Sequence, residues 1–162
     1  MFILKNRRIV ALFISLFAVF QVSACSQSTV AHKSSKGGPS GSLEEQILYY
    51  TNKFRQSKGL KPLQLESAIS QQARSHSKDM ASGRTGFGHE GFEERVAVIS
   101  KKMGRVSGAA ENVAYGTLDA EGVVNGWIKS PGHRKNMLGD YTYIGIGAAD
   151  KGKITLFTQV FI

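Results

Sequence analysis

Two histidines and one glutamate in this chain have side chains suited to metal or proton chemistry. His89 follows a glycine-rich turn, Glu111 begins the run Glu111-Asn112-Val113-Ala114, and His133 follows Pro131-Gly132. Two imidazoles and a carboxylate could hold a divalent metal such as Zn²⁺ and leave positions open for water. Spacing alone does not bring these residues together, and each of them could instead be a structural hydrogen-bonding group.

The sequence around His133 indicates the start of a helix. Ser130-Pro131 resembles an N-cap residue followed by a proline at the first helical position, which would place His133 in the first turn. The helix dipole there favours neutral imidazole, the form that binds metals. Asn136, one turn further on, could orient that imidazole or cap a neighbouring strand. Trp127, the single tryptophan, is expected to fill the core.

Other polar and aromatic positions have simpler interpretations. His76 shares a helix face with apolar residues and is expected to be a core histidine with its hydrogen bonds satisfied. Ser130 fits a cap better than a nucleophile, because no nucleophile-elbow pattern surrounds it. Tyr115 is expected to line the same cleft as His89, Glu111 and His133. Glu94 and Arg95 are interpreted as surface residues.

Hydrophobic spacing predicts helices first and strands later, which indicates an α+β fold. A capping box at residues 42–45 starts the first helix, Gly83 stops the second, and Asp119 caps the fourth. The C-terminal segments are rich in β-forming residues and should make an antiparallel hairpin. The expected helices cover 43–58, 65–82, 92–103 and a segment from 120; the expected extended segments are 112–115, 143–148 and 154–161, with a turn at 150–153.

The N-terminus has the pattern of an export signal. Basic residues within positions 1–8 precede an apolar run, and Val22-Ser23-Ala24-Cys25 resembles the lipobox of bacterial lipoproteins. In that family the signal is cut before the cysteine, which implies a signal peptide at 1–24 and acyl chains such as palmitate on Cys25. The alternatives are an ordinary secretory signal or an uncleaved anchor, although the run is short for a spanning helix. We expect an extracytoplasmic protein held on the bacterial membrane by lipid, and Ser26 allows an outer membrane.

Composition divides the rest of the chain into a tether and one domain. Residues 25–42 contain much Ser, Gly and Lys and too few apolar groups to fold, so after Cys25 they should form a flexible tether. Residues 43–162 suit one compact domain. The net charge is +9, and removing the three basic residues of 1–24 leaves +6. The basic residues are scattered and no nucleic-acid-binding motif accompanies them, so an anionic envelope is the expected surrounding and nucleic acid is not an expected partner.

Residues 43–162 resemble the CAP superfamily, which includes cysteine-rich secretory proteins, antigen 5 and plant pathogenesis-related proteins, and they resemble its bacterial branch in particular. The matching motifs occur in the expected order across nearly the whole domain. They are Asn52-Lys53-Phe54-Arg55, Gly59-Leu60-Lys61-Pro62-Leu63, the segment 73–81, Phe87-Gly88-His89, Glu111-Asn112-Val113-Ala114, the segment 127–138, Ile144-Gly145-Ile146-Gly147 and Thr158-Gln159-Val160-Phe161.

The resemblance implies an α-β-α sandwich with a central antiparallel sheet, and a cleft that typically presents two histidines and two glutamates. By motif, His89 matches the first histidine, Glu111 the first glutamate and His133 the second histidine. Ser130 stands where many members have the second glutamate, so the set is reduced to His-Glu-His. The family's disulfides are missing as well, because Cys25 is the only cysteine.

Three functional hypotheses remain open at this stage. The first is a non-catalytic, membrane-anchored module that needs no cofactor and binds an envelope lipid, glycan or protein through a cleft with His89, Glu111, His133, Asn136 and Tyr115. The second is a metal-dependent hydrolase or protease, with the two histidines on Zn²⁺ and Glu111 as base or third ligand. His89-Glu90-Gly91-Phe92-Glu93 lacks the second histidine of a zincin. The third is a structural polar network without a ligand. The sequence does not give the oligomeric state.

Lipid anchoring can be tested directly at Cys25. Replacing Cys25 by Ser removes the thiol that would carry the acyl chains, and several acyl chains are needed for stable membrane attachment. We therefore expect the Cys25→Ser chain to leave the membrane fraction of fractionated cells. Membrane retention equal to that of the unaltered protein would contradict lipid anchoring.

Overall fold

The computed structural model describes residues 39–162; the predicted signal peptide, Cys25 and most of the predicted tether lie outside this part of the chain. The described residues form an α+β fold, as the sequence predicts. The elements are α1 (Leu43–Gln56), β1 (Gln64–Leu65), α2 (Ser67–Ser82), α3 (Phe92–Met103), β2 (Ala110–Gly116), α4 (Ala120–Lys129), α5 (Pro131–Met137), β3 (Tyr143–Lys151) and β4 (Ile154–Phe161).

The four strands form one sheet in the order β1-β3-β4-β2. The predicted C-terminal hairpin is present, with β3 and β4 antiparallel and Gly152 at φ +62° in the turn. The short extended segment predicted at 112–115 is the middle of β2, which pairs antiparallel with β4 and lies at one edge of the sheet. The sheet is therefore antiparallel except for β1, which adds two residues parallel to β3.

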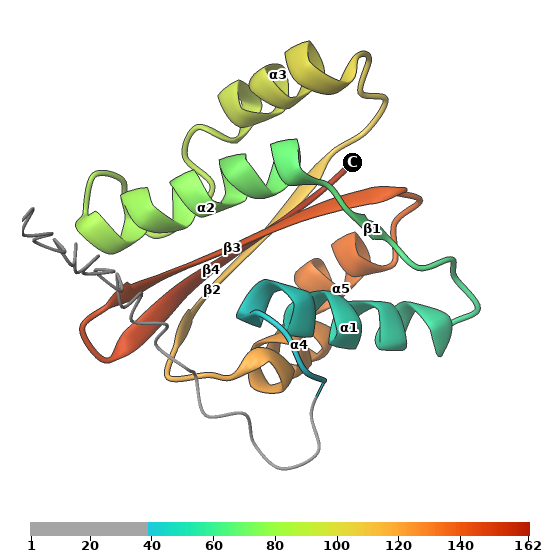
Figure 1. The fold of residues 1–162 in the computed structure, drawn as a ribbon, viewed down its shortest axis with the longest axis horizontal. Coiled ribbons are helices and arrows are strands. Elements are labelled where there is room, and N and C mark those ends of the chain that lie inside the picture. Colours follow the sequence, from blue (N-terminus) through green and yellow to red (C-terminus); the bar gives the residue numbers. More distant parts are fainter. Residues whose placement is uncertain (1–38) are drawn as a thin grey trace, which may run out of the picture. The chain divides into compact units, whose positions relative to one another are not determined.

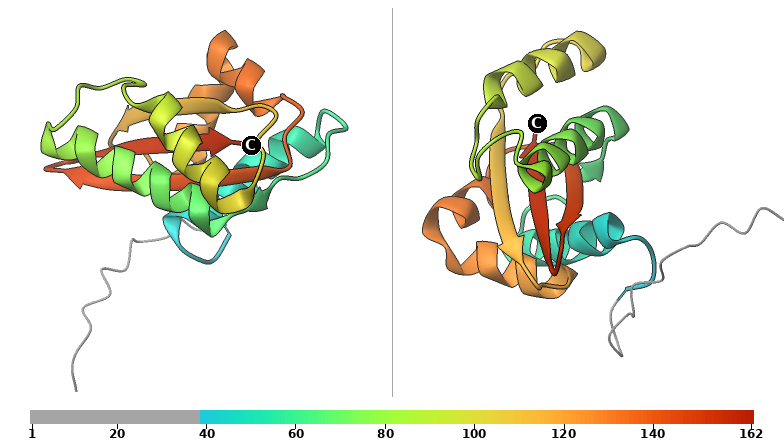
Figure 2. Two further views of the ribbon diagram at one scale, coloured as in Figure 1. Left: turned by 90° about the horizontal axis from the view of Figure 1, so that it is seen from above. Right: turned by 90° about the vertical axis from the view of Figure 1, so that its left-hand side faces the viewer.

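Helices cover both faces of the sheet, as Figures 1 and 2 show. Helices α2 and α3 lie on one face, where Ile69 and Ala73 of α2 pack with Ile99 of α3 and Val160 of β4. Helices α1, α4 and α5 lie on the other face around a larger cluster that includes Trp127, which is buried as predicted. The expected α-β-α arrangement is thus present. Strand β2 lies at the edge of the sheet, between the two helical layers.

The local signals in the sequence set most helix ends. Ser42 and Glu45 form the predicted capping box, Asp119 accepts a hydrogen bond from the Gly122 amide, and Gly83 ends α2 with φ +75°. Leu65 was expected in the second helix, and this is wrong. It belongs to β1 and is 37% exposed, because α2 starts only after its N-cap Glu66. Helix α3 matches its predicted bounds.

Helix α2 lies so close to β3 that two glycines are required there. A Cβ atom added to Gly145 would overlap the backbone of Ile69 and Ser70, and one added to Gly147 would overlap the backbone of Ala73 and Arg74. Both glycines have ordinary backbone angles, so the requirement is for space and not for a special conformation. Within residues 39–162 no helix is both long and apolar enough to cross a bilayer.

The close approach of α2 gives a stability prediction. Gly145→Ala should lower the free energy of unfolding by about 3 kcal/mol or more, because backbone atoms of α2 must move to admit the methyl group. Gly126→Ala is the matched control: nothing lies within 4 Å of its Cβ position in α4, so it should stabilise by about 0.5–1 kcal/mol. Urea unfolding of both variants measures the difference, and equal stability would contradict the contact.

Candidate functional site

The centre of the candidate site is the carboxylate of Glu111 on edge strand β2, which is only 5% exposed. Arg95 of α3 donates to both of its oxygens: Nε lies 3.0 Å from Oε2, and Nη2 lies 2.8 Å from Oε1 and 2.8 Å from Oε2. Such paired guanidinium–carboxylate contacts are among the strongest hydrogen-bonded ion pairs. The negative charge of Glu111 is therefore balanced inside the protein.

His89 makes the remaining contact to this carboxylate. Its Nδ1–H donates to Oε1 of Glu111 at 2.9 Å, while the imidazole is 53% exposed. The contact uses Nδ1 and leaves Nε2 facing outward without a proton in the neutral ring. His89 thus presents a hydrogen-bond acceptor to solvent, in an orientation set by the buried carboxylate.

A second histidine, His76, lies beside Glu111 and holds the backbone next to His89. It is buried in α2, as predicted for a core histidine, and its Nε2–H donates to the carbonyl oxygen of Gly88 at 2.8 Å. The same nitrogen lies 3.8 Å from Oε1 of Glu111. His76 therefore fixes the backbone one residue before His89 and adds a second imidazole beside the carboxylate.

Arg95 was predicted to be a surface residue, and this is wrong. Its side chain is only 10% exposed, because the guanidinium pairs with Glu111 and also donates to the carbonyl of Glu90 at 2.7 Å. The helical spacing contained the signal: Arg95 is three residues after Phe92 and four before Ile99, both of which pack in the α2–α3 core. Glu94 is exposed, as predicted.

A chain of buried amides places His133 on the other side of β2. Asn112 Nδ2 donates to the carbonyl of His133 at 3.2 Å and to Oε1 of Gln159 at 3.3 Å. Gln159 in turn donates to the Thr51 hydroxyl at 2.9 Å. Asn112 and Gln159 are completely buried, and Asn112 is next to Glu111 in the strand. The start of α5, and His133 with it, is therefore tied to the strand that carries the carboxylate.

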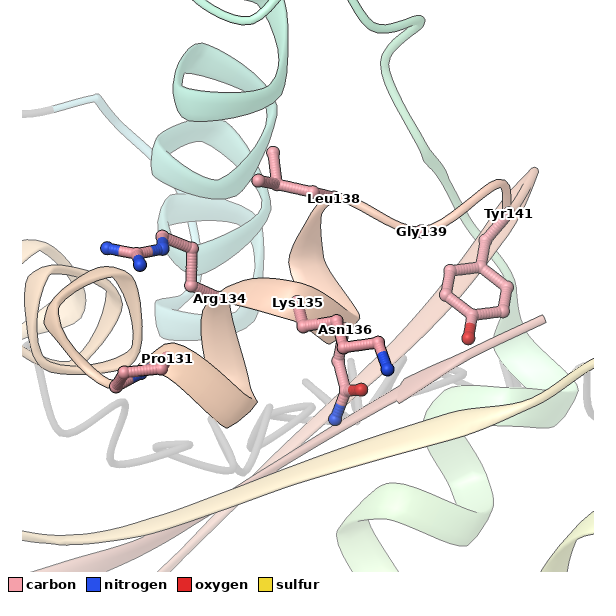
Figure 3. Close-up of a pocket in the computed structure, with 7 residues that line it drawn as sticks. All are labelled: Pro131, Arg134, Lys135, Asn136, Leu138, Gly139 and Tyr141. Atoms are coloured by element: carbon pink, nitrogen blue, oxygen red, sulfur yellow. The ribbon is translucent and has the colours of Figure 1, made fainter.

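Asn136 attaches α5 to the same strand. Its Nδ2 donates to the backbone carbonyl of Glu111 at 3.1 Å and to Oδ1 of Asn112 at 2.9 Å. Figure 3 shows the Asn136 side chain directed at β2, whereas Arg134 points away from it. The sequence allowed Asn136 either to orient the His133 imidazole or to cap a neighbouring strand. Its side chain contacts strand β2, as the second role requires. Ser130 has the N-cap position of α5, but its side chain makes no capping hydrogen bond.

The pocket in Figure 3 lies on the outer side of α5 and has a volume of about 520 Å³. Asn136 is its one residue that also contacts the backbone at Glu111. Neither His89 nor His133 lines it; the lining residues are Pro131, Arg134, Lys135, Asn136, Leu138, Gly139 and Tyr141. The imidazoles thus face a different part of the surface.

Burial favours the neutral form of two imidazoles, those of His76 and His133. Burial lowers the pKa of His76, and the nearby Arg95 adds to this, against the opposing effect of the Gly88 hydrogen bond. Burial also lowers the pKa of the half-buried His133, with a second contribution from the charge of His89.

Tyr115 lies at the far end of β2 from Glu111. It is 58% exposed, and its ring meets that of Phe87 edge to face, with centroids 4.8 Å apart. Phe87 is 53% exposed and precedes His89 by two residues. The segment 87–89 thus runs beside β2, with Phe87 on Tyr115 and His89 on Glu111. In the sequence Phe87 was noted only as part of the motif Phe87-Gly88-His89, and its exposure is seen only in the structure.

Whether Glu111 can bind a metal depends on whether one of its carboxylate oxygens is free. Arg95 and His89 occupy both carboxylate oxygens, so Glu111 is placed to orient His89 and is not free as a third ligand. A ligating histidine commonly has such a carboxylate on its other nitrogen. His89 and His133 are thus the two residues that could hold a metal here. Among residues 39–162 no group of three His, Cys, Asp or Glu side chains is arranged to hold one.

Comparison with known proteins identifies relatives of this arrangement. The sequence pattern of the cysteine-rich secretory protein (CAP) family matches residues 48–161. YkwD of Bacillus subtilis is 38% identical over 122 residues, which cover 74% of this chain and 46% of YkwD. The membrane protein YlbC of the same organism is 35% identical over 131 residues, covering 74% of this chain and 34% of YlbC. This chain thus spans less than half the length of either relative.

A solved structure supports the same grouping. An extracellular protein containing an SCP domain from Bacillus anthracis superposes with a TM-score of 0.65 at 32% identity, covering 74% of this chain and 40% of that protein. The arrangement of helices and strands around the site is therefore shared with an extracytoplasmic protein.

The ion pair between Arg95 and Glu111 gives a sharp test of this geometry. Arg95→Met leaves a buried carboxylate without its counterion and should lower the free energy of unfolding by about 3–5 kcal/mol. Adding Glu111→Gln should restore part of that loss, because a neutral amide needs no counterion. Denaturant unfolding of the three proteins provides the measurement.

Arg84→Met is the control for the Arg95 variant. Arg84 also pairs with a carboxylate, that of Asp79, but its side chain is 74% exposed. Its loss should change stability by no more than about 1 kcal/mol. If Arg95→Met proves as mild as Arg84→Met, Glu111 does not depend on its guanidinium partner.

Proposed function

This chain belongs to the cysteine-rich secretory protein (CAP) family, and on that premise we propose that it is a non-catalytic binding module of the bacterial cell envelope. Its binding residues are His89 and His133, held on the two sides of strand β2, together with Asn136 on the same helix as His133 and Tyr115 at the far end of β2. The ligand is a component of the envelope outside the cytoplasm.

The state of Glu111 is the observation that carries this proposal. A general base must have a lone pair free for the proton that it removes. Both oxygens of Glu111 accept from Arg95, and one also accepts from His89, so no lone pair points to solvent. By the family resemblance, Ser130 also stands at the position of the second glutamate of many eukaryotic members. What remains exposed is the outer edge of His89, where Nε2 can accept a hydrogen bond from a ligand.

The N-terminal pattern and the relatives support a location for the module. We propose that Cys25 carries lipid that holds the chain on the membrane, with residues up to 42 as the tether. Among the relatives, one is named as a membrane protein and one as an extracellular protein. The positive charge of the domain suits a position close to anionic envelope polymers.

A metal-dependent hydrolase is the second candidate. The Nδ1 contact of His89 to Glu111 leaves Nε2 free, and the lowered pKa of His133 favours its neutral, ligating form. A zinc ion bound there would supply a polarised water molecule. The residues of this chain would hold the ion and orient His89, while Glu111 stays paired with Arg95.

The binding role can be tested with isolated envelopes stripped of protein. The mature chain from Ser26, made without its lipid, should bind them, and a His89→Ala/His133→Ala double variant should bind at least about tenfold more weakly, because both proposed binding imidazoles are gone. A sedimentation assay gives the bound fraction as a function of envelope concentration.

Two controls make the result decisive. Asn125→Ala changes an exposed residue of α4 and should bind like the unaltered chain. Repeating the assay with a zinc chelator separates the candidates, since loss of binding or of any hydrolysis under chelation favours the metal site. Undiminished binding by the double variant would leave His89 and His133 with a structural role only.

A further inference from the structure

We propose that the exposed strip formed by Phe87, Tyr115 and His89 binds the N-acetylated amino-sugar strands of the cell wall. This inference rests on the proposed function and names its ligand class. The strip lies along β2, with the rings of Phe87 and Tyr115 at one end and the imidazole of His89 at the other. Glu111 and Tyr115 are four residues apart in an extended strand, so the strip is about 13 Å long, enough for more than one sugar ring.

The strip is held in place before any ligand arrives. His76 fixes the carbonyl of Gly88, the residue between Phe87 and His89, and Glu111 fixes the His89 ring. The contact between the rings of Phe87 and Tyr115 joins the same segment to the end of β2. A site whose parts are already ordered loses little conformational entropy when it binds a ligand.

The size and shape of the aromatic pair favour a small, flat ligand. Each ring is about half exposed, so the two together offer about 200 Å² of apolar area, well below the roughly 800 Å² that each partner of a stable protein complex buries. An acyl chain would need a hollow to enter. The hollows described within residues 39–162 are lined by other residues, with neither Phe87 nor Tyr115 among them. The flat C–H face of a sugar ring matches an exposed aromatic ring.

The hydrogen-bonding state of His89 selects among polar ligands. Since Nδ1–H donates to Glu111, Nε2 of the neutral ring is an acceptor, and its complement is a donor such as an amide N–H or a hydroxyl. Phosphate and carboxylate oxygens offer no such donor. The acetamido group of an amino sugar offers an N–H, and its methyl group can rest on a ring. Because Arg95 balances the charge of Glu111, the site suits an uncharged ligand.

The test uses the full chain, purified in non-ionic detergent, and sacculi freed of protein and of covalently attached wall polymers. We expect Phe87→Ala and Tyr115→Ala each to weaken co-sedimentation with the sacculi by about tenfold, as befits the loss of one stacking ring. Tyr49→Ala is the matched control: Tyr49 is a 48% exposed tyrosine, also edge to face with a neighbouring ring, but it lies on α1. It should bind like the unaltered chain.

Competition identifies the ligand chemistry. Soluble oligosaccharides released from the sacculi by a muramidase should displace the chain, and monomeric dihexanoyl phosphatidylglycerol should not. Displacement by the phospholipid alone, or no binding to sacculi, would overturn the glycan assignment. If the two aromatic variants bind like the unaltered chain while the His89→Ala/His133→Ala variant does not, the aromatic strip is excluded and the proposed function stands. If the unaltered chain binds neither sacculi nor stripped envelopes, both proposals fail.

Discussion

A buried carboxylate on an edge strand must find donors within the protein, and Glu111 organises the residues around it in this way. Water cannot solvate it at 5% exposure, so an uncompensated charge there would be strongly destabilising. Helix α3 brings Arg95 to both oxygens, and the loop before α3 brings His89. His76 holds that loop through Gly88. The carboxylate of Glu111, on strand β2, thus positions both helix α3 and the loop around residue 88.

The alternation of β2 lets the same strand position the opposite layer. Glu111 faces the α2–α3 side, and Asn112 faces α5, where it binds the carbonyl of His133 and continues through Gln159 to Thr51 of α1. The strand thus contacts the His89 imidazole through Glu111 and the backbone carbonyl of His133 through Asn112. Because Arg95 and His89 occupy the carboxylate of Glu111, the groups left at the surface are the His89 imidazole and the exposed rings of Phe87 and Tyr115.

Local sequence signals predicted most helices and strands. Strand β1 and the assembly of the site depend on contacts between residues far apart in the sequence. The capping box at Ser42, the glycine at 83 and the aspartate at 119 act within one helical turn, so they can be found in the sequence. Strand β1 has only two residues and depends on its pairing with β3, which no local pattern reveals. Arg95 occupies an inward helical position, but its charge argues for the surface until its partner sixteen residues away is known. For the same reason the family resemblance, and not spacing, suggested that His89, Glu111 and His133 belong together.

The central claim is that Glu111 accepts from His89 and leaves the outward nitrogen of that ring as an acceptor. Long-range ¹H–¹⁵N correlation spectra of the histidine side chains, assigned with single histidine variants, report which nitrogen carries the proton. The account predicts that neutral His89 is protonated on Nδ1, whereas neutral His76 is protonated on Nε2 because it donates to Gly88. A neutral His89 protonated on Nε2 could not donate to Glu111 and would contradict the account.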